Sequence, residues 1–220
     1  MRYSVVLCAA LLGGCAGMGQ SSFSYTPPKE VEVQNSAIIN DGFEQTWNRL
    51  IANLSKQYFV INNVEKASRI INVSFSTDDP MKYIDCGVTE RTFEPGPGAG
   101  QPEFFNYPSA ISHTKYKATT PNPQAPNFTI PILVERRTKL EGRTNIYLAP
   151  KEGDSEISVN TRYIFTPSVT ASTLAYGGTN TQVLDSVTFN TGNEGRSSEG
   201  MKCLSKGIIE QDIIKAASPR

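Results

Sequence analysis

The sequence has few of the side chains on which enzymes and metal sites depend. It holds one histidine, His113, and four cysteines, and its 21 basic residues balance its 21 acidic residues. No block of like charge stands out, so the composition gives no support for nucleic-acid binding. Long hydrophobic runs are missing too, since no apolar segment approaches the ~20 residues of a membrane-spanning helix.

The N-terminal segment has the pattern of an export signal. Arg2 precedes an apolar run from Val5 to Leu12, and small residues then lead to Cys15. Two other interpretations are a plain secretory signal cut near Ala16 and an uncleaved anchor. The apolar run is far too short for an anchor, and a plain signal does not require a cysteine at this position.

Leu12-Gly13-Gly14-Cys15 resembles the lipobox of bacterial lipoproteins. The resemblance implies a signal peptide of residues 1–14, cleavage before Cys15 and diacylation of the Cys15 sulfur, with chains such as palmitate. The next residue is Ala16 rather than Asp, which in Gram-negative lipoproteins implies transfer to the outer membrane. We therefore expect a lipid-anchored protein whose domain faces the periplasm, held there by more than one acyl chain.

Four cysteines divide between the signal and the mature chain. Cys8 leaves with the signal and Cys15 takes the lipid, so Cys86 and Cys203 remain. An oxidising compartment favours a disulfide between them over two buried free thiols. Two distant cysteines and one histidine do not make a ligand set, so we expect no metal.

The mature chain begins with a polar segment and a helix. Residues 15–29 are small, polar and proline-containing, which predicts a tether leading to a single domain over 30–220. A first strand is expected within 31–39. Helical spacing of apolar residues predicts a helix over 42–56, with Asp41 as its N-cap and Glu44 completing a capping box. Its apolar face consists of Phe43, Trp47, Leu50, Ile51 and Leu54.

Alternating apolar residues predict two hairpins and a final short strand. The first hairpin is expected over 58–64 and 70–77, and the second over 132–148 and 157–165. The short last strand is expected over 187–190. Ser/Thr/Gly-rich loops are expected over 167–185 and 191–201. Leu204, Ile208, Ile209 and Ile213 then predict a closing amphipathic helix over about 203–217.

Residues 94–131 differ in composition from the rest of the chain. They contain eight of the fourteen prolines, so we expect an insertion with little regular structure. Five aromatic residues are interleaved with these prolines. Either they form a partner-binding surface, or they pack the insertion onto its own sheet. The five are Phe104, Phe105, Tyr107, Tyr116 and Phe128.

These elements predict an α+β fold, in which an antiparallel sheet packs against two amphipathic helices. The arrangement resembles the helix-grip fold. An early helix with Trp47, then Phe59-Val60-Ile61, a polar turn and Ile71-Asn72-Val73 also resemble the domains of the BamC-like outer-membrane assembly lipoproteins. That similarity covers residues 41–77 only, and it includes no chemically specific motif.

The sequence contains no clear motif for a catalytic site or a phosphate-binding loop. No nucleophile elbow accompanies His113, and Gly96, Gly98 and Gly100 lack the strand-to-helix setting of a phosphate loop. We therefore expect neither an enzyme nor a cofactor. The leading interpretation is a non-catalytic assembly or accessory subunit that binds other envelope proteins. The alternative is a carrier or sensor holding a small apolar ligand in a helix-grip cavity, which the bulky inward side chains disfavour.

Overall fold

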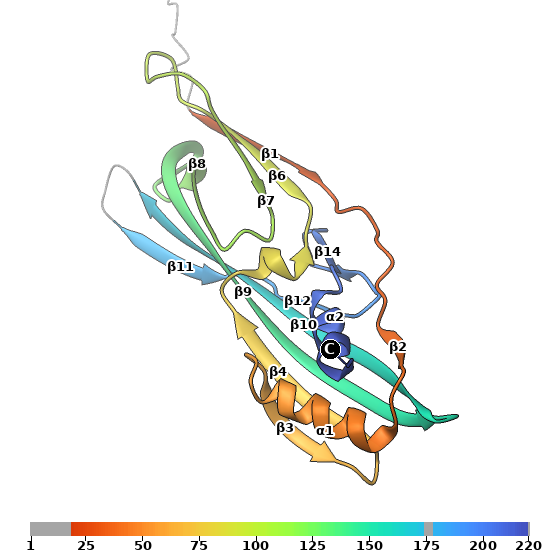
Figure 1. Cartoon of the computed structure of the whole chain (residues 1–220). Coiled ribbons are helices and arrows are strands. Elements are labelled where there is room, and N and C mark those ends of the chain that lie inside the picture. Colours follow the sequence, from red (N-terminus) through yellow and green to blue (C-terminus); the bar gives the residue numbers. More distant parts are fainter. Residues whose placement is uncertain (1–18, 174–177, 220) are drawn as a thin grey trace, which may run out of the picture.

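One long antiparallel ribbon organises the molecule (Figure 1). The structure is a computed structural model that describes residues 19–173 and 178–219. The ribbon consists of β9 (Ala125–Lys151) and β10 (Asp154–Thr173). Its two-residue turn, Glu152-Gly153, has positive φ angles of 48° and 96°, the conformation that tight hairpin turns need.

The ribbon has different neighbours along its two halves. Near the turn, β4 pairs with β9 and β3 pairs with β4, while β2 and β12 pair with β10. At the other end, β8 pairs with β9 and β11 pairs with β10. The bounds are β2 Ser36–Ile39, β3 Val60–Glu65, β4 Ile70–Thr77, β8 His113–Asn122, β11 Thr179–Val183 and β12 Val187–Asn190.

Two helices pack beside the half of the ribbon that contains the turn. They are α1 (Phe43–Leu54) and α2 (Ile208–Ala217), which contact each other and the sheet (Figure 1). Trp47 of α1 and Ile213 of α2 are buried with the alternate side chains of β4, β9 and β10 in the main core. The α+β class, the antiparallel sheet and the two packed helices are therefore confirmed.

Gly142 shows how closely this core is packed. It faces inward on β9, in the alternation that also buries Leu140 and Thr144. A Cβ atom at Gly142 would overlap the ring of Phe75 on β4. The absence of a side chain at Gly142 therefore leaves space for the Phe75 ring in the main core.

Two smaller sheets complete the fold. The first joins β1 (Gln20–Thr26), β6 (Val88–Glu94) and β7 (Glu103–Pro108). The second contains the short strands β5 (Ile84–Asp85), β13 (Gly195–Arg196) and β14 (Lys202–Ser205), and a 3-10 turn, η1 (Pro80–Lys82), precedes β5. We call β1, β6, β7, β8 and residues 125–138 of β9 the aromatic lobe. It forms the end of the molecule opposite the helices (Figure 1).

The tether predicted over residues 15–29 is wrong for residues 20–26. Gln20–Thr26 form β1, which pairs along its whole length with β6. Phe23 and Tyr25 alternate with small polar residues, but this alternation is short, and most of the edge strand is exposed. Only residues 16–19 separate Cys15 from the first paired residue.

The expectation of little regular structure over 94–131 is also wrong. This segment contains β7, β8 and the start of β9. Its prolines occupy the connection at 95–102, strand ends such as Pro108, and positions on the outer hairpin such as Pro121, where a missing donor costs least. The loop predicted over 167–185 is likewise strand in large part, since β10 continues to Thr173 and β11 pairs with it.

The helices differ from prediction at their ends. Gly42, not Asp41, is the N-cap of α1, and no side chain caps it; Asp41 accepts a hydrogen bond from the Gly42 N–H and forms an ion pair with Arg49. Glu44 bonds Lys66 instead of closing a capping box. Helix α2 begins at Ile208, because Cys203 belongs to β14. Both predicted hairpins and the 187–190 strand are confirmed.

Candidate functional site

The aromatic lobe has a small core of its own. Tyr107 of β7 and Tyr116 of β8 stack with ring centroids 6.0 Å apart and planes 16° from parallel. Both are buried with Val134 of β9. Phe105 is partly buried against this cluster, and its ring lies 6.4 Å from that of Tyr116. Three of the five aromatic residues predicted as a partner surface thus pack within the lobe.

The other two predicted aromatic residues are exposed. Phe104 of β7 is 77% exposed and Phe128 of β9 is 54% exposed. Phe23 of β1, which no sequence pattern singled out, is 67% exposed. Register puts Phe23, Arg91 and Phe105 on one face of the three-stranded sheet, and Phe104 on the other. The three exposed rings therefore lie on the outside of the lobe, and Phe105, Tyr107 and Tyr116 pack inside it.

Arg91 lies between two aromatic rings of the lobe. Its guanidinium carbon is 4.3 Å from the ring centroid of Tyr116 and 5.4 Å from that of Phe23. Its Nε donates a hydrogen bond to the Tyr107 hydroxyl at 2.9 Å. Burial raises the pKa of Tyr116, and the charge of Arg91 acts against that shift. The stacking and the hydrogen bond together hold Arg91 in one orientation.

Arg136 of β9 is a buried cation. The residue is only 6% exposed, and its Nη2 donates to the Ser109 carbonyl at 2.7 Å. Its Nη1 is buried and has no hydrogen-bond partner among the described residues. Burial lowers the pKa of Arg136, and nearby Tyr107 and Tyr116 oppose that shift. An arginine nevertheless keeps its charge in a protein, so this is a buried positive group.

Arg91 and Arg136 line one pocket of about 110 Å³. It opens between the aromatic lobe and two segments that follow β11 and β13. Neither arginine forms an ion pair within residues 19–173 and 178–219. The remaining lining residues are Phe23, Tyr25, Thr89, Tyr107, Pro167, Leu184, Asp185, Ser197, Glu199 and Met201. Two arginines meet aromatic and apolar side chains here, with two exposed carboxylates in the same lining, and unpaired guanidinium groups bind acidic groups.

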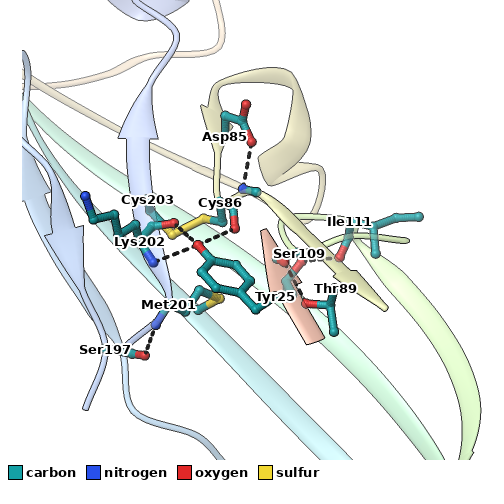
Figure 2. Close-up of a disulfide and its surroundings, with 12 residues drawn as sticks. Tyr25, Asp85, Cys86, Thr89, Ser109, Ile111, Ser197, Met201, Lys202 and Cys203 are labelled. Atoms are coloured by element: carbon teal, nitrogen blue, oxygen red, sulfur yellow. Dashed lines mark hydrogen bonds between the residues drawn. A yellow bond between two sulfur atoms is a disulfide. The ribbon is translucent and has the colours of Figure 1, made fainter. Parts of the chain in front are cut away.

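The disulfide lies beside this pocket. Cys86 and Cys203 are bonded, as expected from the sequence, and both are fully buried. Figure 2 shows the Tyr25 hydroxyl pointing at this bridge: it lies 3.1 Å from the carbonyl oxygens of Cys86 and Lys202, and it accepts from the Lys202 N–H at 2.9 Å. Tyr25, a pocket residue, thereby ties β1 to the disulfide.

A second group of hydrogen bonds holds Ser109, the residue whose carbonyl accepts from Arg136. The Ser109 hydroxyl bonds the Thr89 hydroxyl at 2.8 Å (Figure 2). The Ser109 N–H donates to the Gly87 carbonyl, also at 2.8 Å. Because these bonds fix the backbone at Ser109, the carbonyl that receives Arg136 Nη2 is held in place.

The other residues singled out from the sequence lie elsewhere. Cys15, the predicted lipidation site, is outside the described residues. His113 lies 3.0 Å from Glu135 on the surface of the β8–β9 hairpin. Among the residues that the structure describes, no group of three or more His, Cys, Asp or Glu side chains could hold a metal ion, and no helix is long and apolar enough to cross a membrane.

Sequence reasoning did not identify Arg91 or Arg136 as site residues. A signal for Arg136 was present, because alternation along β9 puts it on the same face as Val134 and Leu140, a face of otherwise uncharged side chains. Arg91 carried no such signal, since its surroundings depend on the pairing of β1 with β6. Comparison of the chain with protein-family models, curated proteins and solved structures finds no match.

Proposed function

We propose that this protein is a non-catalytic lipoprotein of the bacterial outer membrane, acting as an assembly or accessory subunit that binds another envelope protein. The observation that supports this most is the contrast within the aromatic lobe. Phe23, Phe104 and Phe128 are each more than half exposed, while Tyr107 and Tyr116 are buried. Aromatic side chains are enriched where proteins bind one another, and here the lobe's own packing leaves three of them uncovered.

The lipid anchor places this lobe next to the membrane. If Cys15 bears the lipid, β1 begins only five residues later, at Gln20. A fully extended chain of that length spans at most ~18 Å. The aromatic lobe is therefore the membrane-proximal end, facing a partner that is itself at the outer membrane, and the helices lie at the distal end.

We also propose that the domain has a helix-grip-like arrangement. Its support is that α2 packs against β10 on the inner face of the sheet. The space between them is filled by Tyr163, Phe165, Ile209 and Ile213, none of which is exposed. This filled interior favours the binding subunit over the alternative, a carrier with an apolar cavity at that place.

Lipidation is tested by replacing Cys15. We expect Cys15→Ser to leave the protein in the periplasm or with an uncleaved signal, because the serine hydroxyl cannot take the thioether-linked lipid. Cell fractionation shows where the variant resides, and its intact mass shows whether the signal was cleaved and a lipid attached. The control is Ser22→Cys in the Cys15→Ser background, which keeps a thiol near the N-terminus but outside the lipobox. Maturation at the same site with outer-membrane fractionation would remove the lipoprotein assignment.

Partner binding is tested by surface substitutions. We expect Phe104→Ser combined with Phe128→Ser to reduce chemical crosslinking to the partner at least tenfold, which corresponds to ~1.4 kcal/mol of binding free energy. The melting temperature should remain nearly unchanged, since exposed substitutions away from special features change stability by about 0.5 kcal/mol or less. Deleting residues 94–131 would not test partner binding, because β7 and β8 in this range are paired strands and their loss would disrupt the fold.

A matched control uses exposed apolar residues at the other end. Val64 is 40% exposed and Tyr147 is 44% exposed on the half of the sheet that α1 packs against. Val64→Ser with Tyr147→Ser should leave crosslinking at the wild-type level. Equal loss in both double variants would mean that the aromatic lobe is not the binding surface.

A further inference from the structure

Arg91 and Arg136 line one pocket, and neither has an acidic partner within ion-pair distance among the described residues. Arg136 is buried, donates one hydrogen bond to a backbone carbonyl, and leaves Nη1 without a partner among the described residues. An unpaired buried charge costs several kcal/mol, so structures normally supply a counter-ion. The described part of the chain supplies none to Arg136 and none to Arg91.

The lining of the pocket restricts the charge of its ligand. Asp185 and Glu199 are exposed residues that line the same pocket as the arginines. Their charges offset those of the two arginines, so the lining as a whole gives a dianion no electrostatic advantage. A monoanion costs less to remove from water than a dianionic phosphate, so it suits this pocket better.

The walls restrict the shape of the ligand. Phe23, Leu184 and Met201 contribute apolar surface, and the hydroxyls of Tyr25 and Tyr107 already take part in hydrogen bonds within the protein. Guanidinium groups match the planar geometry of a carboxylate. A pocket of about 110 Å³ holds a small group of this kind with a ring or a short chain attached.

We propose that the Arg91–Arg136 pocket binds a monocarboxylate attached to a small apolar or aromatic body. The carboxylate pairs with the buried Arg136 and the half-buried Arg91. The apolar part lies against Phe23, Leu184 and Met201. The carboxylate belongs either to a free small molecule or to an acidic group of a protein partner. This site is a property of the chain alone, and its test needs no partner.

The test follows methionine methyl groups in the full chain by NMR. Met201 lines the pocket, and Met81 lies outside it near Lys206, so labelled methionine provides a reporter and an internal control. Benzoate is the probe, benzamide is its neutral counterpart, and inorganic phosphate tests the charge argument. We expect a saturable shift of the Met201 signal with benzoate, at least tenfold weaker binding of benzamide and phosphate, and no change at Met81.

Substitution of the arginines tests the assignment of the charge. Arg136→Gln should weaken benzoate binding at least tenfold, and Arg136→Lys should retain part of it. If Arg136→Gln does not fold, as judged by the Met81 signal, Arg91→Gln serves as the second variant, with the exposed Arg162→Gln as control. No saturable Met201 shift in the wild-type chain, or equal binding of benzoate and benzamide, would overturn the proposal.

Crosslinking in cells then separates the two sources of the carboxylate. Loss of partner crosslinks in Arg136→Gln, together with loss of benzoate binding, assigns the carboxylate to the partner. Retained crosslinks with loss of benzoate binding assign it to a free small molecule. If benzoate binds and the aromatic-lobe variants show no partner, the pocket stands and the protein-binding function fails.

Discussion

Removing the disulfide is expected to destabilise this protein severely. Cys86→Ala with Cys203→Ala should lower the free energy of unfolding by about 4–5 kcal/mol, the loop-entropy value for a bridge closing ~100 residues. The two cysteines are 117 residues apart, and both are fully buried. The bridge joins the residue that follows β5 to β14, next to the short β5–β14 pairing.

Urea unfolding of the double variant measures this loss. The single variants should lose about as much, since either one opens the bridge. Tyr25 bonds the backbone at both cysteines, so β1 should also become more accessible to limited proteolysis in the double variant. A loss below ~1 kcal/mol, or an unchanged cleavage pattern in β1, would contradict this role of the bridge.

Loss of the Glu210 carboxylate is expected to have the second largest effect. Glu210 is fully buried in the first turn of α2. The Tyr163 hydroxyl lies 2.9 and 3.0 Å from its two oxygens, and the Thr191 hydroxyl donates to it at 2.6 Å. A negative group near a helix N-terminus is also favourable. Glu210→Ala leaves the buried Tyr163 hydroxyl without its acceptor and removes the shorter of the two hydrogen bonds that the part-buried Thr191 hydroxyl donates, which should cost about 3 kcal/mol.

The matched variant separates the acceptor from the charge. Glu210→Gln keeps a carbonyl acceptor for Tyr163 and should lose only about 1–2 kcal/mol, because the bonds to a charged group are the stronger ones. Adding Tyr163→Phe to Glu210→Ala should cost less than the sum of the two single changes, since the pair is in direct contact. Additive losses by chemical denaturation would show that the carboxylate and the hydroxyl do not stabilise α2 together.

The elements that the sequence predicted correctly are those in which buried and exposed side chains alternate with a regular period. Ile71, Val73 and Phe75 alternate because only one face of β4 is buried, and Trp47, Leu50 and Leu54 recur with helical spacing because only one face of α1 is buried. Each pattern is contained in one element. Local sequence therefore carried the information for both hairpins and for the first helix.

The missed elements are those that depend on distant partners. β1 is mostly exposed, and its own sequence carries only the short alternation of Phe23 and Tyr25 with small polar residues; its pairing with β6 defines it. In β7 and β8, the prolines occupy edges and turns, which composition alone does not reveal. The candidate pocket has the same origin, since Arg91, Arg136 and Met201 come from three separate segments that the fold brings together.

Photocrosslinking in intact cells tests the proposed function most directly. A photoreactive residue is placed singly at position 23, 104 or 128, and at positions 64 and 147 as controls. Phe23 and Phe104 lie on opposite faces of the lobe's sheet, so their relative yields also report which face the partner covers. We expect adducts with one envelope protein from the aromatic-lobe positions and none from the controls. Adducts with lipid alone, or equal adducts from positions 64 and 147, would contradict the proposed function.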